Sequence, residues 1–240
     1  HVRSVGGEAR NSLAVVESRT EDHQSIIYRN GAADFEMGLE DVELVDYAAY
    51  SALITTGTVL AAEPSRSASF RAFELAKAAR LPLIFDLDYR PYSWPSPQVA
   101  SETYSRAADY FDIVIGNDVE FGFMAGSYEK GLEKARDLAK TTAQIVIYKM
   151  GEKGAITLTS DGEFRTGIYP VTALKPTGAG DSFMGGFIAA LATGRDLHDA
   201  VLRGSASAAI VVSKVGCAPA MPDTAELEAF LDEHAEPTQI

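Results

Sequence analysis

A glycine-rich turn with the sequence TGAGDS occupies residues 177–182. Apolar residues recur every four positions after it, which predicts a helix over 182–192 with Asp181 beside its first turn. Backbone N–H groups of such a turn bind an anion, and the helix N-terminus adds partial positive charge. A carboxylate at the same place can accept the proton of an attacking hydroxyl, so the turn indicates phosphoryl transfer to an alcohol. The candidate catalytic residues are Gly178, Ala179, Gly180 and Asp181.

The turn differs from two familiar phosphate-binding motifs. The chain contains no Gly-Lys pair, which excludes a Walker A loop, and Phe183 stands where the dinucleotide fingerprint has its third glycine. Aspartate is also a common helix cap, and glycine is common in loops. A turn that merely begins a helix is therefore the alternative to a catalytic turn.

Strands and helices alternate from about residue 44, and this pattern must position the turn. Continuous apolar strands alternating with helices predict a parallel sheet covered on both faces. The predicted strands are 53–60, 83–85, 113–115 and 145–147, a hairpin is predicted over 155–169, and the predicted helices are 65–79, 97–108, segments through 141, 182–192, 197–213 and 224–234.

The N-terminal part has a different pattern. Two short β-prone runs, 12–17 and 25–29, flank a polar stretch at 18–24 and indicate an antiparallel pair. We therefore expect residues 1–43 to form a β segment of a lid or sheet edge, and residues 44–240 to form one α/β core.

Polar residues follow three of the predicted strands. Ligands of open α/β sheets bind at the carboxyl ends of the strands, so these residues are candidates for a site. They are Asp86, Asp88 and Arg90 after the second strand, Asn117 and Glu120 after the third, and Lys149 after the fourth.

Asp86, Asp88 and Arg90 alternate along the chain, so they share one direction if the strand continues through them. Two carboxylates beside a guanidinium suit a polyol with an acidic group, because Arg binds carboxylate or phosphate bidentately. A strand end with a capping aspartate and an internal ion pair is the alternative.

Two further segments each allow a structural and a functional interpretation. Asn117 and Glu120 have the spacing of a helix capping box, and Glu120 is also suited to orient waters around Mg²⁺. Lys149, Gly151 and Gly154 either contact a nucleotide or form the turn into the hairpin. The small residues over 204–209 favour close helix packing over contact with an adenine.

The composition excludes several classes of protein. The 240 residues carry a net charge of −13, which argues against a nucleic-acid or anionic-membrane partner. The single cysteine, Cys217, forms no internal disulfide, and this fits a cytoplasmic location. No apolar run reaches the length of a membrane span.

In combination, three motifs resemble those of the ribokinase-like (PfkB) family of carbohydrate kinases. Along the chain they are Asn117 with Glu120, then Gly151 with Gly154, then residues 177–181, which is the order in which the family has them. The resemblance implies a three-layer α/β/α sandwich with a mainly parallel sheet and a small β lid. It also implies ATP, Mg²⁺ and a monovalent cation such as K⁺ as cofactors, and a homodimer is possible in this family. The family's N-terminal portion is expected to be missing from this chain.

The resemblance also implies roles for single residues. It makes Asp181 the base and the Gly178–Gly180 turn the anion hole, with Asn117 and Glu120 serving phosphate and Mg²⁺. Lys149, Gly151 and Gly154 are then placed beside the nucleotide.

Within the family, residues 85–94, 28–34, 210–214 and 220–222 resemble a subgroup that phosphorylates a keto-deoxy sugar acid of inositol catabolism. Arg29 and Arg90 are expected to neutralise the sugar's carboxylate, with Asp86 and Asp88 on its hydroxyls. The kinases of 2-keto-3-deoxygluconate are the alternative within the family. A non-catalytic sugar-acid or nucleotide sensor is the alternative of another class, and a dehydrogenase lacks its glycine fingerprint.

Overall fold

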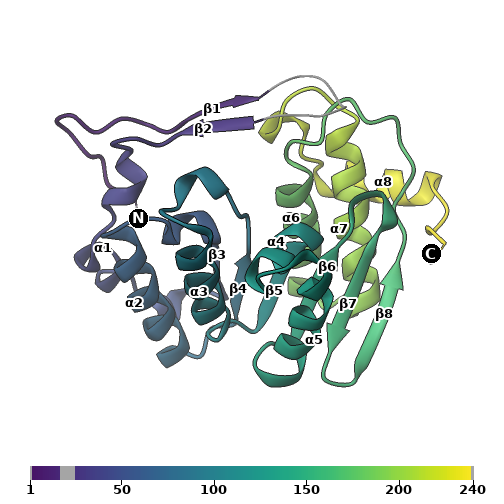
Figure 1. Cartoon of the computed structure of the whole chain (residues 1–240). Coiled ribbons are helices and arrows are strands. Elements are labelled where there is room, and N and C mark those ends of the chain that lie inside the picture. The colour runs from purple at the N-terminus through teal and green to yellow at the C-terminus, as the bar shows by residue number, and fades with distance from the viewer. Residues whose placement is uncertain (1, 17–24, 239–240) are drawn as a thin grey trace. The chain divides into compact units, whose positions relative to one another are not determined.

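The computed structural model describes residues 2–16 and 25–238 (Figure 1). The chain divides into two compact units. The first comprises Ile27–Gly151 and Ala155–Phe164 together with the residues before Ala14, and the second comprises Glu152–Gly154 and the chain from Arg165 onward, with a short N-terminal part. Each unit is described by itself.

A six-stranded mixed sheet forms the centre of the first unit. Its strands follow the order β3-β4-β5-β6-β7-β8, and β3 to β6 run parallel while β7 is antiparallel to β6. The predicted, mainly parallel sheet is therefore confirmed. The strands are β3 (Leu53–Thr56), β4 (Leu83–Asp86), β5 (Ile113–Asn117), β6 (Ile145–Lys149), β7 (Ala155–Thr159) and β8 (Gly162–Thr166).

Helices of the first unit pack on this sheet and bury an aromatic core. Every side chain of β4 is buried, as expected for a parallel strand covered by helices. The Phe111 ring packs against Phe73 and Phe85, with centroids 4.8 and 4.7 Å apart. The helices are α1 (Leu39–Glu43), α2 (Ser65–Ala78), α3 (Pro97–Ala108), α4 (Asp118–Met124) and α5 (Gly131–Thr141).

The second unit is built on two long helices, α6 (Ala179–Ala192) and α7 (Leu197–Val212), followed by α8 (Thr224–Glu233). Small residues allow α6 and α7 to approach closely. A Cβ at Gly186 would lie 2.3 Å from Ser207 Oγ, and one at Gly204 would lie 2.8 Å from the Phe183 carbonyl oxygen. The small residues predicted to serve helix packing do so.

The N-terminal runs form a separate two-stranded sheet of β1 (Leu13–Val16) and β2 (Ser25–Tyr28). The predicted polar stretch at 18–24 lies outside the described residues. The lid role of residues 1–43 stays a prediction.

One predicted strand is shorter than expected. The run 53–60 was predicted as a single strand, but β3 ends at Thr56 and residues Gly57–Leu60 form a 3₁₀ turn. The backbone packs closely where the strand ends: a Cβ at Gly57 would lie 2.1 Å from Tyr104 Cε1 and 2.3 Å from the Leu87 carbonyl oxygen. Long-range packing of this kind is invisible to a local pattern.

No helix among the described residues combines the length and apolar character that crossing a membrane requires.

Candidate active site

The carboxyl ends of β4, β5 and β6 meet at one edge of the first unit's sheet. Asp86 is paired in register with Ile115, and Asn117 is paired with Lys149. The parallel strands therefore bring together Asp86, Asn117 and Lys149, as the sequence predicted.

Asn117 and Glu120 form the predicted capping box at the start of α4. The Glu120 N–H donates to Asn117 Oδ1 at 2.9 Å, and the Asn117 N–H donates to Glu120 Oε2 at 2.7 Å. The structural interpretation is therefore confirmed. The other carboxylate oxygen, Oε1, accepts the N–H of Tyr89 at 3.2 Å, so Glu120 joins α4 to the loop after β4.

Glu120 is buried beside other carboxylates. Burial raises its pKa to about 7, and Asp86 and Asp88 add to the rise, whereas the Asn117 N–H and Lys149 oppose it. A cation close to this carboxylate would stabilise its charged form. Carboxylate oxygens are the hard donors that Mg²⁺ prefers, so the residues present fit that ion. Among the described residues, no three His, Cys, Asp or Glu side chains are grouped as metal ligands.

The loop after β4 departs from the predicted extension of the strand. β4 ends at Asp86, and Asp88 has a φ of +37°, so the expectation that Asp86, Asp88 and Arg90 share one strand direction is wrong. The chain turns because Leu87 bonds to Ile115 of the next strand and Tyr89 bonds to Glu120. Arg90 Nη2 contacts Asp88 Oδ1 at 2.5 Å, which confirms the internal ion pair weighed as the alternative.

Aromatic rings of α3 and α4 pack against the loop after β4 and hold it in place. Tyr89 stacks on Phe123 of α4 with centroids 3.6 Å apart and an interplanar angle of 16°. Tyr89 and Trp94 both pack against Tyr104 of α3, at 6.0 and 5.4 Å. The sequence gave no signal for Tyr104, which resembles any other core residue of a helix.

Arg29 lies near the end of β3, where its side chain is already engaged. Arg29 Nη1 donates to the Thr58 carbonyl oxygen at 3.2 Å, and the guanidinium also pairs with Asp34. It stacks over the Phe35 ring at 4.0 Å. These contacts fix the guanidinium beside the sheet edge that carries Asp86.

The second unit carries the glycine-rich segment at the start of a helix, as predicted, but α6 begins at Ala179, three residues before the predicted start at 182. Gly178 has a φ of +88°, a conformation that favours glycine, and it is the N-cap residue of α6. Asp181 lies exposed in the first turn of that helix. The first N–H groups of a helix have no intrahelical acceptor, so the turn retains donors for an anion. One of them, the Ala179 N–H, donates weakly to the Pro176 carbonyl oxygen at 3.3 Å.

Packing behind the turn holds it in place. The Ser182 hydroxyl donates to the Ser207 carbonyl oxygen of α7 at 2.9 Å. Lys175 Nζ donates to the Thr177 carbonyl oxygen at 2.6 Å, which fixes the residues before Gly178. The position of Asp181 therefore depends on the α6–α7 pair.

The glycines between β6 and β7 have structural reasons of their own. Gly151 and Gly154 have φ values of +57° and +77°. A Cβ at Gly154 would lie 1.9 Å from the Thr166 carbonyl oxygen, which only glycine avoids. The predicted turn into the hairpin is confirmed, and contact of these residues with a nucleotide stays a prediction.

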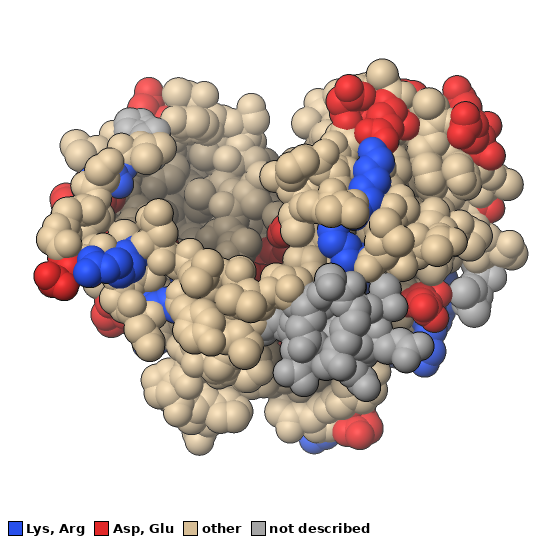
Figure 2. All heavy atoms as spheres, turned by 90° about the horizontal axis from the view of Figure 1, so that it is seen from above, with Lys and Arg blue, Asp and Glu red and all other residues tan. Residues whose placement is uncertain are grey.

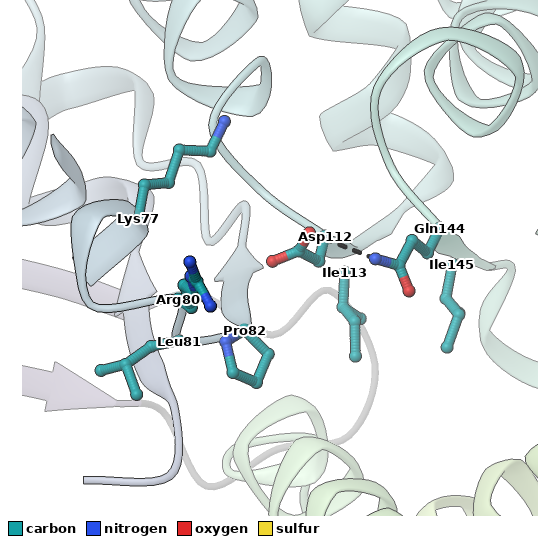
Figure 3. A pocket seen from close by; sticks show the side chains of 8 residues that line it. All are labelled: Lys77, Arg80, Leu81, Pro82, Asp112, Ile113, Gln144 and Ile145. Carbon is teal, nitrogen blue, oxygen red and sulfur yellow. Dashed lines mark hydrogen bonds between the residues drawn. The ribbon is translucent and has the colours of Figure 1, made fainter. Parts of the chain in front are cut away.

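A groove of about 580 Å³ lies at the opposite edge of the sheet, at the amino ends of β4, β5 and β6 (Figure 3). Its acidic residue, Asp112, accepts the Leu83 N–H at 2.8 Å and bonds weakly to Gln144 Nε2 at 3.4 Å. These contacts join neighbouring strands, and the groove contains none of the predicted site residues.

Charged side chains of both signs are spread over the face shown in Figure 2, where Lys and Arg occur in small separate groups. The predicted lack of a nucleic-acid or membrane partner rests on the net charge of −13.

Comparison with known proteins identifies the class to which this α/β fold and its polar sheet edge belong. A model described as pfkB family carbohydrate kinase matches residues 1–224, and the chain belongs to this family. The predicted resemblance is confirmed, and the protein is a carbohydrate kinase.

Two curated relatives carry the same name, 5-dehydro-2-deoxygluconokinase. The protein of Photobacterium profundum is 41% identical over 230 residues, which cover 93% of this chain and 69% of that protein. The protein of Halalkalibacterium halodurans is 38% identical over 228 residues, with 93% and 69% covered.

Among solved structures, the chain resembles a double-mutant fructokinase of Vibrio cholerae with fructose, ADP and potassium ion bound. The TM-score is 0.82 at 28% identity, over 94% of this chain and 74% of that one. A calcium-bound form of the Vibrio cholerae fructokinase gives a TM-score of 0.82 at 27% identity, over 94% and 75%.

Proposed function

We propose that the protein transfers the γ-phosphoryl group of ATP to the primary hydroxyl of 5-dehydro-2-deoxy-D-gluconate, forming the 6-phosphate in inositol catabolism. The observation that carries the proposal is the left-handed turn at Gly178, which places Asp181 exposed in the first turn of α6 of a pfkB-family chain. The relatives' shared name supports the choice of sugar acid.

In the proposed reaction, the Asp181 carboxylate accepts the proton of the sugar's hydroxyl as its oxygen attacks the γ-phosphorus. The bond from that phosphorus to the β,γ-bridging oxygen breaks, and ADP leaves. The N–H groups of Gly178, Ala179 and Gly180 donate hydrogen bonds that stabilise the negative charge on the transferred phosphoryl group. Mg²⁺, when bound, neutralises charge on the phosphate oxygens, and Glu120 is the proposed residue near it.

The first unit supplies the groups proposed for the sugar acid and all of those proposed for the nucleotide except Gly154, which belongs to the second unit. Arg90 and Arg29 are proposed to face the carboxylate, because a guanidinium binds a carboxylate through two parallel N–H groups. Asp86 and Asp88 are proposed to accept hydroxyl protons. The proposed nucleotide residues are Lys149, Gly151, Gly154 and Asn117.

Several finer features stay predictions. A bound potassium ion is described for the Vibrio cholerae fructokinase, and we propose that a monovalent cation also serves this chain. A homodimer is proposed on the family resemblance, and a cytoplasmic location is proposed on the single cysteine.

The test is ADP release by the purified protein with 5-dehydro-2-deoxygluconate, 2-keto-3-deoxygluconate and fructose offered separately. We expect the first to give the highest kcat/KM. Preference for 2-keto-3-deoxygluconate or fructose would retain the kinase and reject this substrate. Binding of ATP and sugar acid without ADP release would support a sensor instead.

The Asp181→Asn variant tests the proposed base. We expect kcat to fall about 10²–10⁴-fold with little change in ATP binding, because only the proton acceptor is lost. Asp232→Asn, on an exposed residue of α8 in the same unit, is the matched control and should retain full turnover. Full turnover by Asp181→Asn would remove this residue from the mechanism.

A further inference from the structure

Four buried polar side-chain atoms of the described residues have no hydrogen-bond partner. Three of them lie on or beneath the loop that follows β4, and the fourth, Thr157 Oγ1, lies on β7. The three are Arg90 Nε, Trp94 Nε1 and Tyr104 Oη. Buried polar groups are nearly always paired in folded proteins, so three orphans around one loop point to a ligand.

The three atoms belong to one packed group. The Trp94 and Tyr104 rings lie 5.4 Å apart, and Tyr104 also packs against Tyr89, the residue before Arg90. Tyr104 is fully buried and Trp94 is 8% exposed. Both side chains are therefore held rigidly beside the Asp88–Arg90 ion pair.

All three atoms act as donors. An arginine Nε–H and an indole N–H only donate hydrogen bonds. Burial raises the pKa of the Tyr104 phenol, and the nearby Asp88 carboxylate raises it further, so this hydroxyl stays protonated at neutral pH. Three buried donors on or beneath one loop suit a ligand rich in acceptor oxygens, such as a carboxylate with neighbouring hydroxyls.

We propose that Tyr104 and Trp94 are sugar-acid-binding residues, which donate hydrogen bonds to the acidic sugar, directly or through one water, beside the Nε–H of Arg90. The inference rests on the proposed function and adds two residues to its substrate site. It also explains why Arg90 keeps its Nε–H free while its Nη2 contacts Asp88.

The Tyr104→Phe variant separates a binding role from a packing role, because loss of packing would lower the Tm whereas loss of a binding contact would raise the KM for the sugar acid. Phenylalanine keeps the ring and removes only a hydroxyl that has no partner in the ligand-free protein. We expect the Tm without ligand to stay equal or to rise. The KM for the sugar acid should rise about tenfold, while the KM for ATP stays unchanged.

Thr157→Val is the matched control, because it removes the fourth unpartnered buried hydroxyl from a strand in the same unit. Its Tm should stay equal or rise as for Tyr104→Phe, with both KM values unchanged. Trp94→Phe is a second test of the binding group and should also raise the KM for the sugar acid. A wild-type KM in Tyr104→Phe would overturn the proposal, as would an equal rise of both KM values with a lowered Tm.

Binding of the sugar acid without ATP, measured by calorimetry on the wild type and on Tyr104→Phe, separates this inference from the proposed function. Binding by the wild type without turnover rejects the kinase activity on this substrate alone, and a weaker affinity of the variant still supports the inference. Equal affinity of the two proteins overturns it. A wild type that binds no sugar acid rejects both.

Discussion

Replacing Glu120 by glutamine removes a carboxyl group that is buried in the folded chain and hydrated in the unfolded one. Its pKa is raised from the ordinary 4.5 to about 7 in the folded state, mainly by burial. The folded protein therefore holds this proton more tightly than the unfolded chain does. Its contribution to stability is fully present below pH 4.5 and is lost as the pH rises through 7.

The two pKa values set the size of the effect. Their separation corresponds to about 3 kcal/mol. Between pH 5 and pH 8, we expect the free energy of unfolding of the wild type to fall by about 2–3 kcal/mol relative to Glu120→Gln. Glutamine also changes how the N–H groups of Asn117 and Tyr89 are accepted, but that offset is the same at every pH and does not affect the slope.

Urea unfolding followed by Trp94 fluorescence measures this difference. Trp94 is the only tryptophan, and it is buried in the core of the same unit as Glu120. Glu133→Gln, on an exposed residue of α5, is the control and should follow the wild type at every pH. If the free energies of unfolding of the wild type and of Glu120→Gln changed in parallel from pH 5 to pH 8, the inference that ionising Glu120 destabilises the folded protein would be refuted.

Two further substitutions, one of them with a control, test the turn between β6 and β7 and the loop after β4. Gly154→Ala should lower the free energy of unfolding by about 3 kcal/mol or more, because its φ of +77° disfavours alanine and its Cβ would lie 1.9 Å from the Thr166 carbonyl oxygen. Gly194→Ala has a φ of +79° with no atom near its Cβ, so it should cost only about 1 kcal/mol; equal losses in thermal melts followed by circular dichroism would contradict the clash. Arg90→Lys should raise the KM for the sugar acid about tenfold and leave the KM for ATP unchanged, because lysine cannot bind a carboxylate bidentately; unchanged steady-state kinetics would exclude Arg90 from the sugar site.

Features encoded by neighbouring residues were predicted from the sequence. The turn before Asp181 follows from two glycines and a helical period, and the Asn117–Glu120 capping box is closed within four residues. The alternation of strands and helices predicted which strand ends carry Asp86 and Lys149. In each case the controlling interactions are local, so the residue types alone determine them.

Contacts between distant segments were decided by the tertiary structure. The bond from the Tyr89 N–H to Glu120 joins residues 31 positions apart, and no local pattern signals it. The same holds for the early end of β3 at Thr56, where Gly57 lies against the Tyr104 ring. Burial, the raised pKa of Glu120 and the unpaired hydroxyl of Tyr104 all arise from which surfaces pack together. The physical reason is that packing brings together residues that lie far apart in the sequence and removes water from their polar groups.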